Sequence, residues 1–177
     1  MGPPSATDYA DIASGLGVTF TFFDRDGEYR PHNRAGAKDH ALPRLNDGMY
    51  AQNNDDASHC VWFDGEGRFY ADLQTGVRIA RINTYSHHRA ERARQYFSIW
   101  GSNAETMPDP GFLHGGHDGW TLLAVVDTRE CGGGGVHGTS VEPPAGQAWL
   151  GPFRYLLYIA PTGPGTFFTE IDVHAAE

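Results

Sequence analysis

The chain is a succession of short apolar runs that are rich in β-branched and aromatic residues, and a turn follows nearly every run. Such side chains favour strands, and alternation rather than a helical period marks several of the runs. Only residues 90–96 could pass for a helix, and that segment is too short to matter. The runs lie at Val18–Phe23, Val61–Phe63, Arg68–Leu73, Val77–Tyr85, Gln95–Gly101, Trp120–Val126, Phe153–Ile159 and Thr166–Val173. The sequence therefore predicts an all-β protein.

Turn-forming residues support this prediction. The 177 residues include 23 glycines and 11 prolines, against roughly 21 of the two together at average usage. The length suits one domain of two packed sheets. We expect residues 1–16, rich in Gly, Pro, Ser and Asp, to be a loosely ordered lead-in and residues 17–177 to form a single β-sandwich domain. The glycine tract Gly132–Gly135 reads as a flexible loop.

Charge and hydropathy exclude several partners. The net charge of −9 argues against nucleic acid and anionic membranes, because both call for a basic surface. No apolar run approaches the roughly 18 residues of a membrane-spanning helix, so we expect no membrane insertion. Met1–Ala10 lacks the pattern of a secretory signal. Three arginines, Arg89, Arg92 and Arg94, form a local exception to the acidic composition.

Two cysteines, Cys60 and Cys131, are too few to form a zinc site on their own. In an oxidising compartment they would close one long loop as a disulfide, and in a reducing one they would be ordinary thiols. The sequence leaves both options open.

Several short motifs occur in a fixed order over residues 45–173. They are Asn46-Asp47-Gly48, Ser58-His59 with Trp62, Ala71-Asp72-Leu73, Gln95 to Ser102, Asp118-Gly119-Trp120, Arg154-Tyr155-Leu156 and Glu170 to Val173. This series resembles the coagulation factor V/VIII type C (discoidin) family, which includes the family 32 carbohydrate-binding modules with a galactose-binding-like fold. The resemblance implies a jelly-roll β-sandwich that binds its ligand, without catalysis, through loops at one end. The long segment before Asn46 and the Gly132–Gly135 tract depart from the family pattern.

A structural Ca²⁺ ion is the first site that the resemblance implies. Calcium takes six to eight oxygen ligands from carboxylates and backbone carbonyls. The loop from Leu45 to Asn54 supplies such oxygens, with Asp47 as its carboxylate. In the family a glutamate on the last strand completes the ligand shell, and Glu170 matches it. The plain alternative is that Asp47 caps a turn and Glu170 lies on a solvated face.

A glycan-binding end is the second implied site. Sugars are bound by aromatic faces together with planar polar groups that reach pairs of hydroxyls. His59 and Trp62 resemble the histidine and aromatic pair of galactose-binding family 32 modules, and Arg89 matches their arginine. Phe167 or Phe168 matches the aromatic residue of the last loop, and Gln95 is the nearest candidate for the further polar ligand. Each of these residues also has an ordinary structural interpretation in the core or a loop.

Two other functions compete with glycan binding. A protein-adhesion or assembly domain of the same fold would use an apolar patch, for which Phe112, Trp62 and Phe167 are candidates. A metal-dependent enzyme would use histidines such as His114 and His117. Their glycine-rich segment cannot be a stable helix, so the spacing carries no geometric support.

The sequence thus favours a non-catalytic, calcium-stabilised carbohydrate-binding module that recognises a glycan or polysaccharide. By the resemblance we expect a secreted or cell-surface location, next to other domains of a parent protein such as a carbohydrate-active enzyme.

Overall fold

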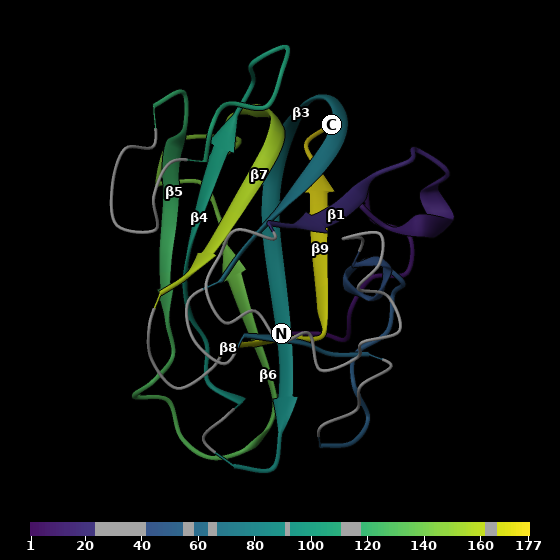
Figure 1. Ribbon diagram of the computed structural model, residues 1–177, viewed down its shortest axis with the longest axis vertical. Helices are drawn as coiled ribbons and strands as arrows, with labels where there is room; N and C mark the ends of the chain where they lie inside the picture. The colour runs from purple at the N-terminus through teal and green to yellow at the C-terminus, as the bar shows by residue number, and fades with distance from the viewer. Residues whose placement is uncertain (24–41, 55–58, 64–66, 91–92, 111–117, 162–165) are drawn as a thin grey trace.

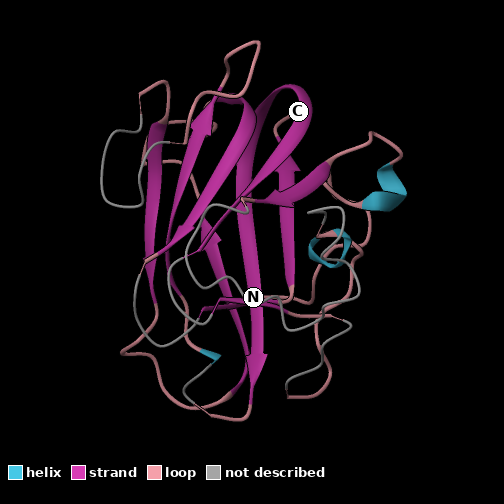
Figure 2. Cartoon of the chain, in the orientation of Figure 1, coloured by secondary structure: helices cyan, strands magenta, loops and turns pink. Residues whose placement is uncertain are grey.

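A computed structural model describes residues 1–23, 42–54, 59–63, 67–90, 93–110, 118–161 and 166–177. Within these ranges the protein is built from strands and short 3₁₀ turns (Figure 2), which confirms the all-β prediction. The elements are η1 (Ile12–Ser14), β1 (Thr19–Phe22), η3 (Pro43–Leu45), β2 (Val61–Phe63), β3 (Gly67–His88), β4 (Tyr96–Ser102), β5 (Thr121–Asp127), β6 (Gly135–Val141), β7 (Pro152–Ala160), β8 (Thr166–Phe168) and β9 (Glu170–Ala175).

Strand β3 belongs to both layers of the sandwich. Its first half pairs with β1 and β7, in a sheet of order β1-β3-β7-β4-β5, and its second half pairs with β6 and β9. The register against β7 shifts between Asp72 and Val77, where Gln74 adopts a positive φ of 69°. Figure 1 shows β3 bending at the top of the molecule and running down to its end at the bottom. The predicted two-sheet sandwich is confirmed.

Aromatic side chains fill the space between the layers. Phe69 stacks on Tyr158, with ring centroids 4.6 Å apart, and Phe168 meets the edges of Phe69 and Phe97 at 5.0 and 4.9 Å. All four rings are buried. Full burial of one such side chain stabilises the fold by about 1.5–3 kcal/mol, so this cluster is a major part of the core.

The segment before β1 contacts the sandwich. The Tyr9 backbone N–H donates to the Val173 carbonyl of β9 at 3.0 Å, and the Asn46 side chain donates to the Ala10 carbonyl at 2.8 Å. Ala10 is fully buried. Part of the expected lead-in is therefore held against β9 and η3, and the division at residue 16 stays a prediction.

Strand β6 was not predicted from the sequence. Its first residue, Gly135, ends the glycine tract, and its three β-branched residues, Val136, Thr139 and Val141, are interrupted by Gly138. The strand forms because it pairs with the last seven residues of the second half of β3, from Ile82 to His88. Tertiary pairing thus overrides weak local propensity.

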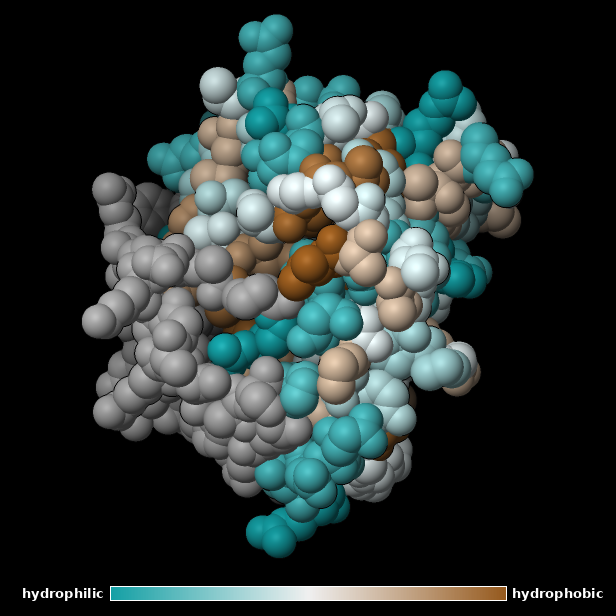
Figure 3. Space-filling model, turned by 90° about the vertical axis from the view of Figure 1, so that its right-hand side faces the viewer, coloured by the Kyte–Doolittle hydropathy of each residue, from teal (hydrophilic) through white to brown (hydrophobic). Residues whose placement is uncertain are grey.

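In the view of Figure 3 the described residues show a central group of hydrophobic side chains, with hydrophilic residues above and below it. Among the described residues no helix has the length and apolar character needed to cross a membrane. Cys60 is buried and Cys131 is exposed, and no disulfide joins the two.

Candidate functional site

A depression lies at the end of the sandwich where β3 finishes and β6 begins, at the bottom of Figure 1. Its volume is about 610 Å³, within the usual range for small-ligand sites. Its described lining is polar and comes from three segments: Gln52, Asn53, Asn54, His87, Arg89 and Gly135. We refer to these residues as the loop-end site.

Arg89 and His87 are tied to the segment that precedes β2. The Arg89 backbone N–H donates to Oδ1 of Asn54. Nδ1 of His87 lies 2.6 Å from the Ala51 carbonyl oxygen, which can only accept, so Nδ1 carries the proton. In the neutral form of the ring, Nε2 is then the acceptor. Arg89 itself is exposed, so a guanidinium donor and an imidazole acceptor lie side by side at this end.

The glycine tract has a specific packing role beside Arg89. A Cβ atom at Gly134 would collide with the carbonyl group of Arg89 and with the nitrogen of Ala90. Gly135 adopts a φ of 110°, which side-chain-bearing residues rarely take. The interpretation of the tract as merely a flexible loop is therefore incomplete, because Gly134 allows the β5–β6 connection to approach the backbone of the site.

Two sequence-predicted ligand residues lie beneath the surface. Gln95 is fully buried, accepts a hydrogen bond from the Thr84 hydroxyl at 3.0 Å and donates to the Phe167 carbonyl at 3.0 Å. The Phe167 ring is also fully buried, with its centroid 5.6 Å from that of His88. The predictions of Gln95 as a ligand and of Phe167 as a stacking platform are wrong, because neither side chain reaches solvent. Phe168 is in the core as well.

The remaining sequence-predicted ligands fall into three cases. Arg89 lies in the loop-end site. His59 is half-buried and lies near Asp47, where it offsets part of the rise that burial causes in the pKa of that carboxyl. Trp62 has its backbone in β2, paired with Phe167, but its side chain lies outside the described part of the structure. Phe112, His114 and His117 lie outside the described residues, and Phe167, the described member of the predicted adhesion patch, is buried.

The structure brings the two predicted metal ligands together. The Asp47 backbone N–H donates to Oε2 of Glu170 at 3.2 Å. Glu170 is fully buried, and Oε1 has no hydrogen-bond partner among the described residues. Burial, followed by the nearby Asp47 carboxyl, raises the pKa of Glu170 to about 10. Burial also raises the pKa of Asp47.

This donor set fits a hard cation. A buried carboxylate oxygen with no partner, beside a second carboxyl, is the environment that Ca²⁺ neutralises with oxygen ligands. Within the described ranges no three or more His, Cys, Asp or Glu side chains group as metal ligands, so backbone carbonyls would have to supply the other oxygens. The interpretation of Glu170 as a residue on a solvated face is wrong, because its side chain is buried.

Solved structures with similar architecture include a fucolectin from the serum of the striped bass Morone saxatilis, at 17% identity and a TM-score of 0.60, covering 96% of this chain and 48% of that one. The lectin domain of lectinolysin complexed with Lewis b antigen matches at 12% identity and a TM-score of 0.58, over 98% and 99% of the two chains. An F5/8 type C domain of a Bacteroides fragilis protein matches at 14% identity and 0.53, over 91% and 93%. The fold is a discoidin-like β-sandwich.

This chain spans about half the length of the fucolectin. No protein-family model and no curated protein matches its sequence. At such low identity the likeness to discoidin-like domains establishes the fold alone.

Sequence reasoning missed most of the loop-end site. His87 stands in the sequence only as half of an adjacent histidine pair, and Gln52 to Asn54 read as turn residues. One signal was present: His87 and Arg89 are two residues apart where a strand ends, so they share a face in extended backbone. What could not be read from the sequence is that residues 51–54 fold back onto that strand end.

Proposed function

We propose that the chain is a non-catalytic glycan-binding domain and that the loop-end site holds the sugar. The observation that carries the proposal is the convergence of Arg89, His87 and the side-chain amides of Gln52, Asn53 and Asn54 on one depression. These side chains offer donors and acceptors in planar pairs, which match the adjacent hydroxyls of a pyranose ring.

Arg89 has the central role in this proposal. Its guanidinium presents a rigid set of N–H donors that can reach two neighbouring hydroxyl oxygens at once. The hydrogen bond from its own backbone to Asn54 fixes the start of the loop that carries it. Nε2 of His87, as an acceptor, complements these donors. The arrangement favours a sugar whose hydroxyls both accept and donate on one edge.

Similar proteins favour the same class of ligand. The fucolectin and the lectinolysin domain are lectins by name, and the latter is complexed with Lewis b. We therefore propose Lewis b and its constituent monosaccharides as the first glycans to test. The depression is open and few groups are buried, so a single sugar is expected to bind weakly, with a Kd on the order of 0.1–1 mM.

We further propose that a calcium ion, held by Asp47, Glu170 and backbone carbonyls of the 45–54 loop, stabilises the domain. The ion would neutralise the two carboxyls and connect this loop to β9. Because the same loop carries Gln52 to Asn54, the ion would also hold one wall of the loop-end site in place.

A weak binding domain is most useful when it is part of a larger protein. We propose that it serves a secreted or cell-surface parent protein, in which it holds a glycan near neighbouring domains and raises the effective concentration there.

A glycan array that includes Lewis b tests the proposal with three proteins: the unchanged chain, Arg89→Ala, and Arg78→Ala as a matched control. Arg78 is another exposed arginine on β3, near the start of its second half. Binding by the unchanged chain and Arg78→Ala but not by Arg89→Ala is the expected result. Equal glycan binding by all three folded proteins would contradict the site, and no glycan binding by the calcium-loaded chain would contradict the function.

A further inference from the structure

The outer face of the second sheet carries a row of polar side chains. Asn83 of β3 is paired with Asp172 of β9 on one side and with Ser140 of β6 on the other. The alternate residues Ile82 and Ile171 are fully buried in the core, so the polar set faces away from it. Three adjacent strands thus place an amide, a carboxylate and a hydroxyl side by side.

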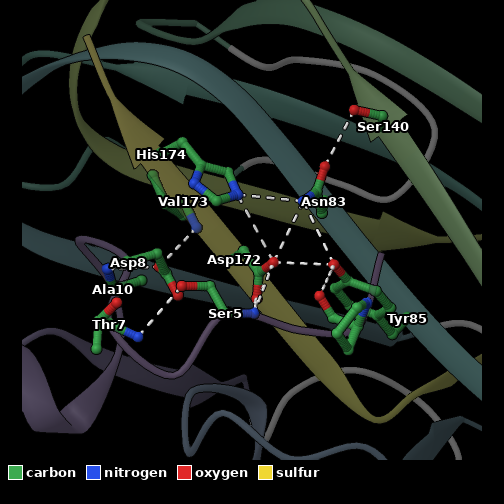
Figure 4. Close-up of polar contacts among 11 residues, drawn as sticks. Ser5, Thr7, Asp8, Ala10, Asn83, Tyr85, Ser140, Asp172, Val173 and His174 are labelled. Carbon is green, nitrogen blue, oxygen red and sulfur yellow. Dashed lines mark hydrogen bonds and ion pairs between the residues drawn. The ribbon is translucent and has the colours of Figure 1, made fainter. Parts of the chain in front are cut away.

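Asp172 is the centre of this row, and Figure 4 shows its contacts. Its carboxylate accepts hydrogen bonds from the Tyr85 hydroxyl at 2.9 Å, from Asn83 Nδ2 at 3.2 Å and from the Ser5 backbone N–H at 3.2 Å. Asp172 is only 1% exposed. A buried carboxylate with this many donors holds its neighbours in fixed positions.

The side chains held by this network reach the surface. Asn83 Nδ2 lies 3.1 Å from Nε2 of His174, and the exposed Ser140 hydroxyl donates to Asn83 Oδ1 at 3.0 Å. Burial, then the nearby Arg81 guanidinium, lowers the pKa of His174, so its ring is neutral near pH 7. Arg81 is itself exposed. Hydrogen-bond donors and acceptors therefore lie together above the buried Asp172 carboxylate.

These residues line a groove of about 470 Å³. Met1, Gly2 and Pro3 form part of its lining, and the exposed Glu142, which follows β6, forms another part. The Pro3 carbonyl also accepts from the Tyr85 hydroxyl at 3.4 Å. The first residues of the chain thus turn the flat outer face of a sheet into a walled groove.

We propose that this sheet-face groove is a second binding site and that its ligand is a neutral saccharide. Arg81 and the Nδ1–H group of His174 offer donors, while Glu142 and the Ser140 hydroxyl oxygen offer acceptors, so hydroxyl groups are satisfied in both directions. A charged ligand is disfavoured because Arg81 and Glu142, which carry opposite charges, both line the groove. The volume suits one or two sugar rings.

The groove and the loop-end site are separate. Arg81 lies in β3, and Arg89 directly follows the end of this strand. The two residues are eight positions apart, which corresponds to about 26 Å of extended chain. One monosaccharide cannot reach both. The saccharide class follows from the groove's own donors and acceptors, so the proposal does not depend on the loop-end site.

Chemical-shift titration tests the groove. The ¹⁵N-labelled chain carrying Arg89→Ala is titrated separately with D-galactose, L-fucose and N-acetyl-D-glucosamine to about 50 mM each, a range that covers weak sites. We expect at least one sugar to shift the backbone amides of residues 81–85 and 172–174 in a saturable way. We expect Arg81→Ala, and Glu142→Gln, to weaken that binding by about fivefold or more, whereas Arg129→Ala, an exposed arginine on the β5–β6 connection, leaves it unchanged.

Two results would overturn the proposal. One is the absence of saturable shifts at residues 81–85 and 172–174 with all three sugars. The other is saturable shifts that Arg81→Ala and Glu142→Gln leave unaltered in folded protein, since the sugar would then not contact the groove. Failure of the loop-end site would appear separately, as unshifted amides of residues 87–89 in the chain that retains Arg89.

Discussion

The backbone N–H of Asp47 donates to Oε2 of Glu170 at 3.2 Å and so connects residues 123 positions apart. The contact attaches the loop after η3 to the first residue of β9. Glu170 is buried, and its second carboxylate oxygen has no partner among the described residues. Two carboxyls in such a place favour a cation, and this contact is the physical basis of the calcium proposal.

Calcium should stabilise the protein strongly. An ion that binds only the folded state adds about 2.7 kcal/mol at a hundredfold excess over its Kd. For a chain of this size that corresponds to a rise in Tm of about 5–10 °C. Thermal melts in EDTA and after restoring Ca²⁺ measure the effect.

Glu170→Gln is the control, because it keeps the side-chain shape and removes the charge. When Ca²⁺ has been removed with EDTA, burial raises the pKa of Glu170 from 4.5 in the unfolded chain to about 10. The contribution of protonated Glu170 to the free energy of unfolding is therefore complete below pH 4.5 and is lost as the pH rises toward 10. The calcium effect should grow over the same range, since binding displaces a proton. An equal calcium response in Glu170→Gln would contradict the assignment.

Asp8→Asn should stabilise the protein at pH 8. Burial raises the pKa of Asp8 from 3.8 to about 6, so the ionised form opposes folding above that pH. Asn keeps the acceptor for the Ala10 and Val173 N–H groups. We expect a gain of about 1–3 kcal/mol at pH 8 that disappears below about pH 4. Urea unfolding at the two pH values measures it, and a loss of stability at pH 8 would contradict the stated origin of the pKa shift.

Much of the fold could be predicted from the sequence. Runs such as Val77–Tyr85 and Phe153–Ile159 have side chains that suit only strands, and both lie in strands of the sandwich. The proximity of Asp47 and Glu170 could be predicted as well, because the order of motifs matched a known arrangement. These features depend on local propensity and on motif order.

The parts that could not be predicted depend on tertiary contacts. Strand β6 has weak propensity and forms by pairing with β3. Alternation along a strand predicts that either Phe167 or its adjacent residues face solvent. The adjacent residues Thr166 and Phe168 are buried as well as Phe167, so this periodicity could not identify an exposed side chain. Gln95 reads as a polar surface residue, yet it satisfies two buried partners.

Gly134→Ala should impair glycan binding more than stability. The added Cβ collides with the Arg89 carbonyl group, so the loop carrying Arg89 must move. Gly132→Ala is the matched control, because a Cβ there meets nothing within 4 Å. We expect an affinity loss of about tenfold, or 1.4 kcal/mol, for Gly134→Ala alone. Titration calorimetry measures this, and equal affinities for the two variants would contradict the packing role.

The two thiols should differ in reactivity. Cys131 is exposed and Cys60 is 1% exposed, and no disulfide joins them. A thiol reagent such as DTNB should label Cys131 at once and Cys60 only on unfolding, because burial excludes the reagent. Mass spectrometry identifies the labelled residue. A chain with no reactive thiol until reduction would show instead that the two cysteines form a disulfide.

The most direct test of glycan binding at the loop end is a chemical-shift titration of the calcium-loaded, ¹⁵N-labelled chain with Lewis b. We predict saturable shifts of the amides of residues 52–54 and 87–89, together with the Arg89 Nε–H signal, and their loss in Arg89→Ala. Lewis b binding that shifts other residues and leaves these unmoved would contradict the site, and the absence of saturable shifts anywhere would contradict the proposed ligand.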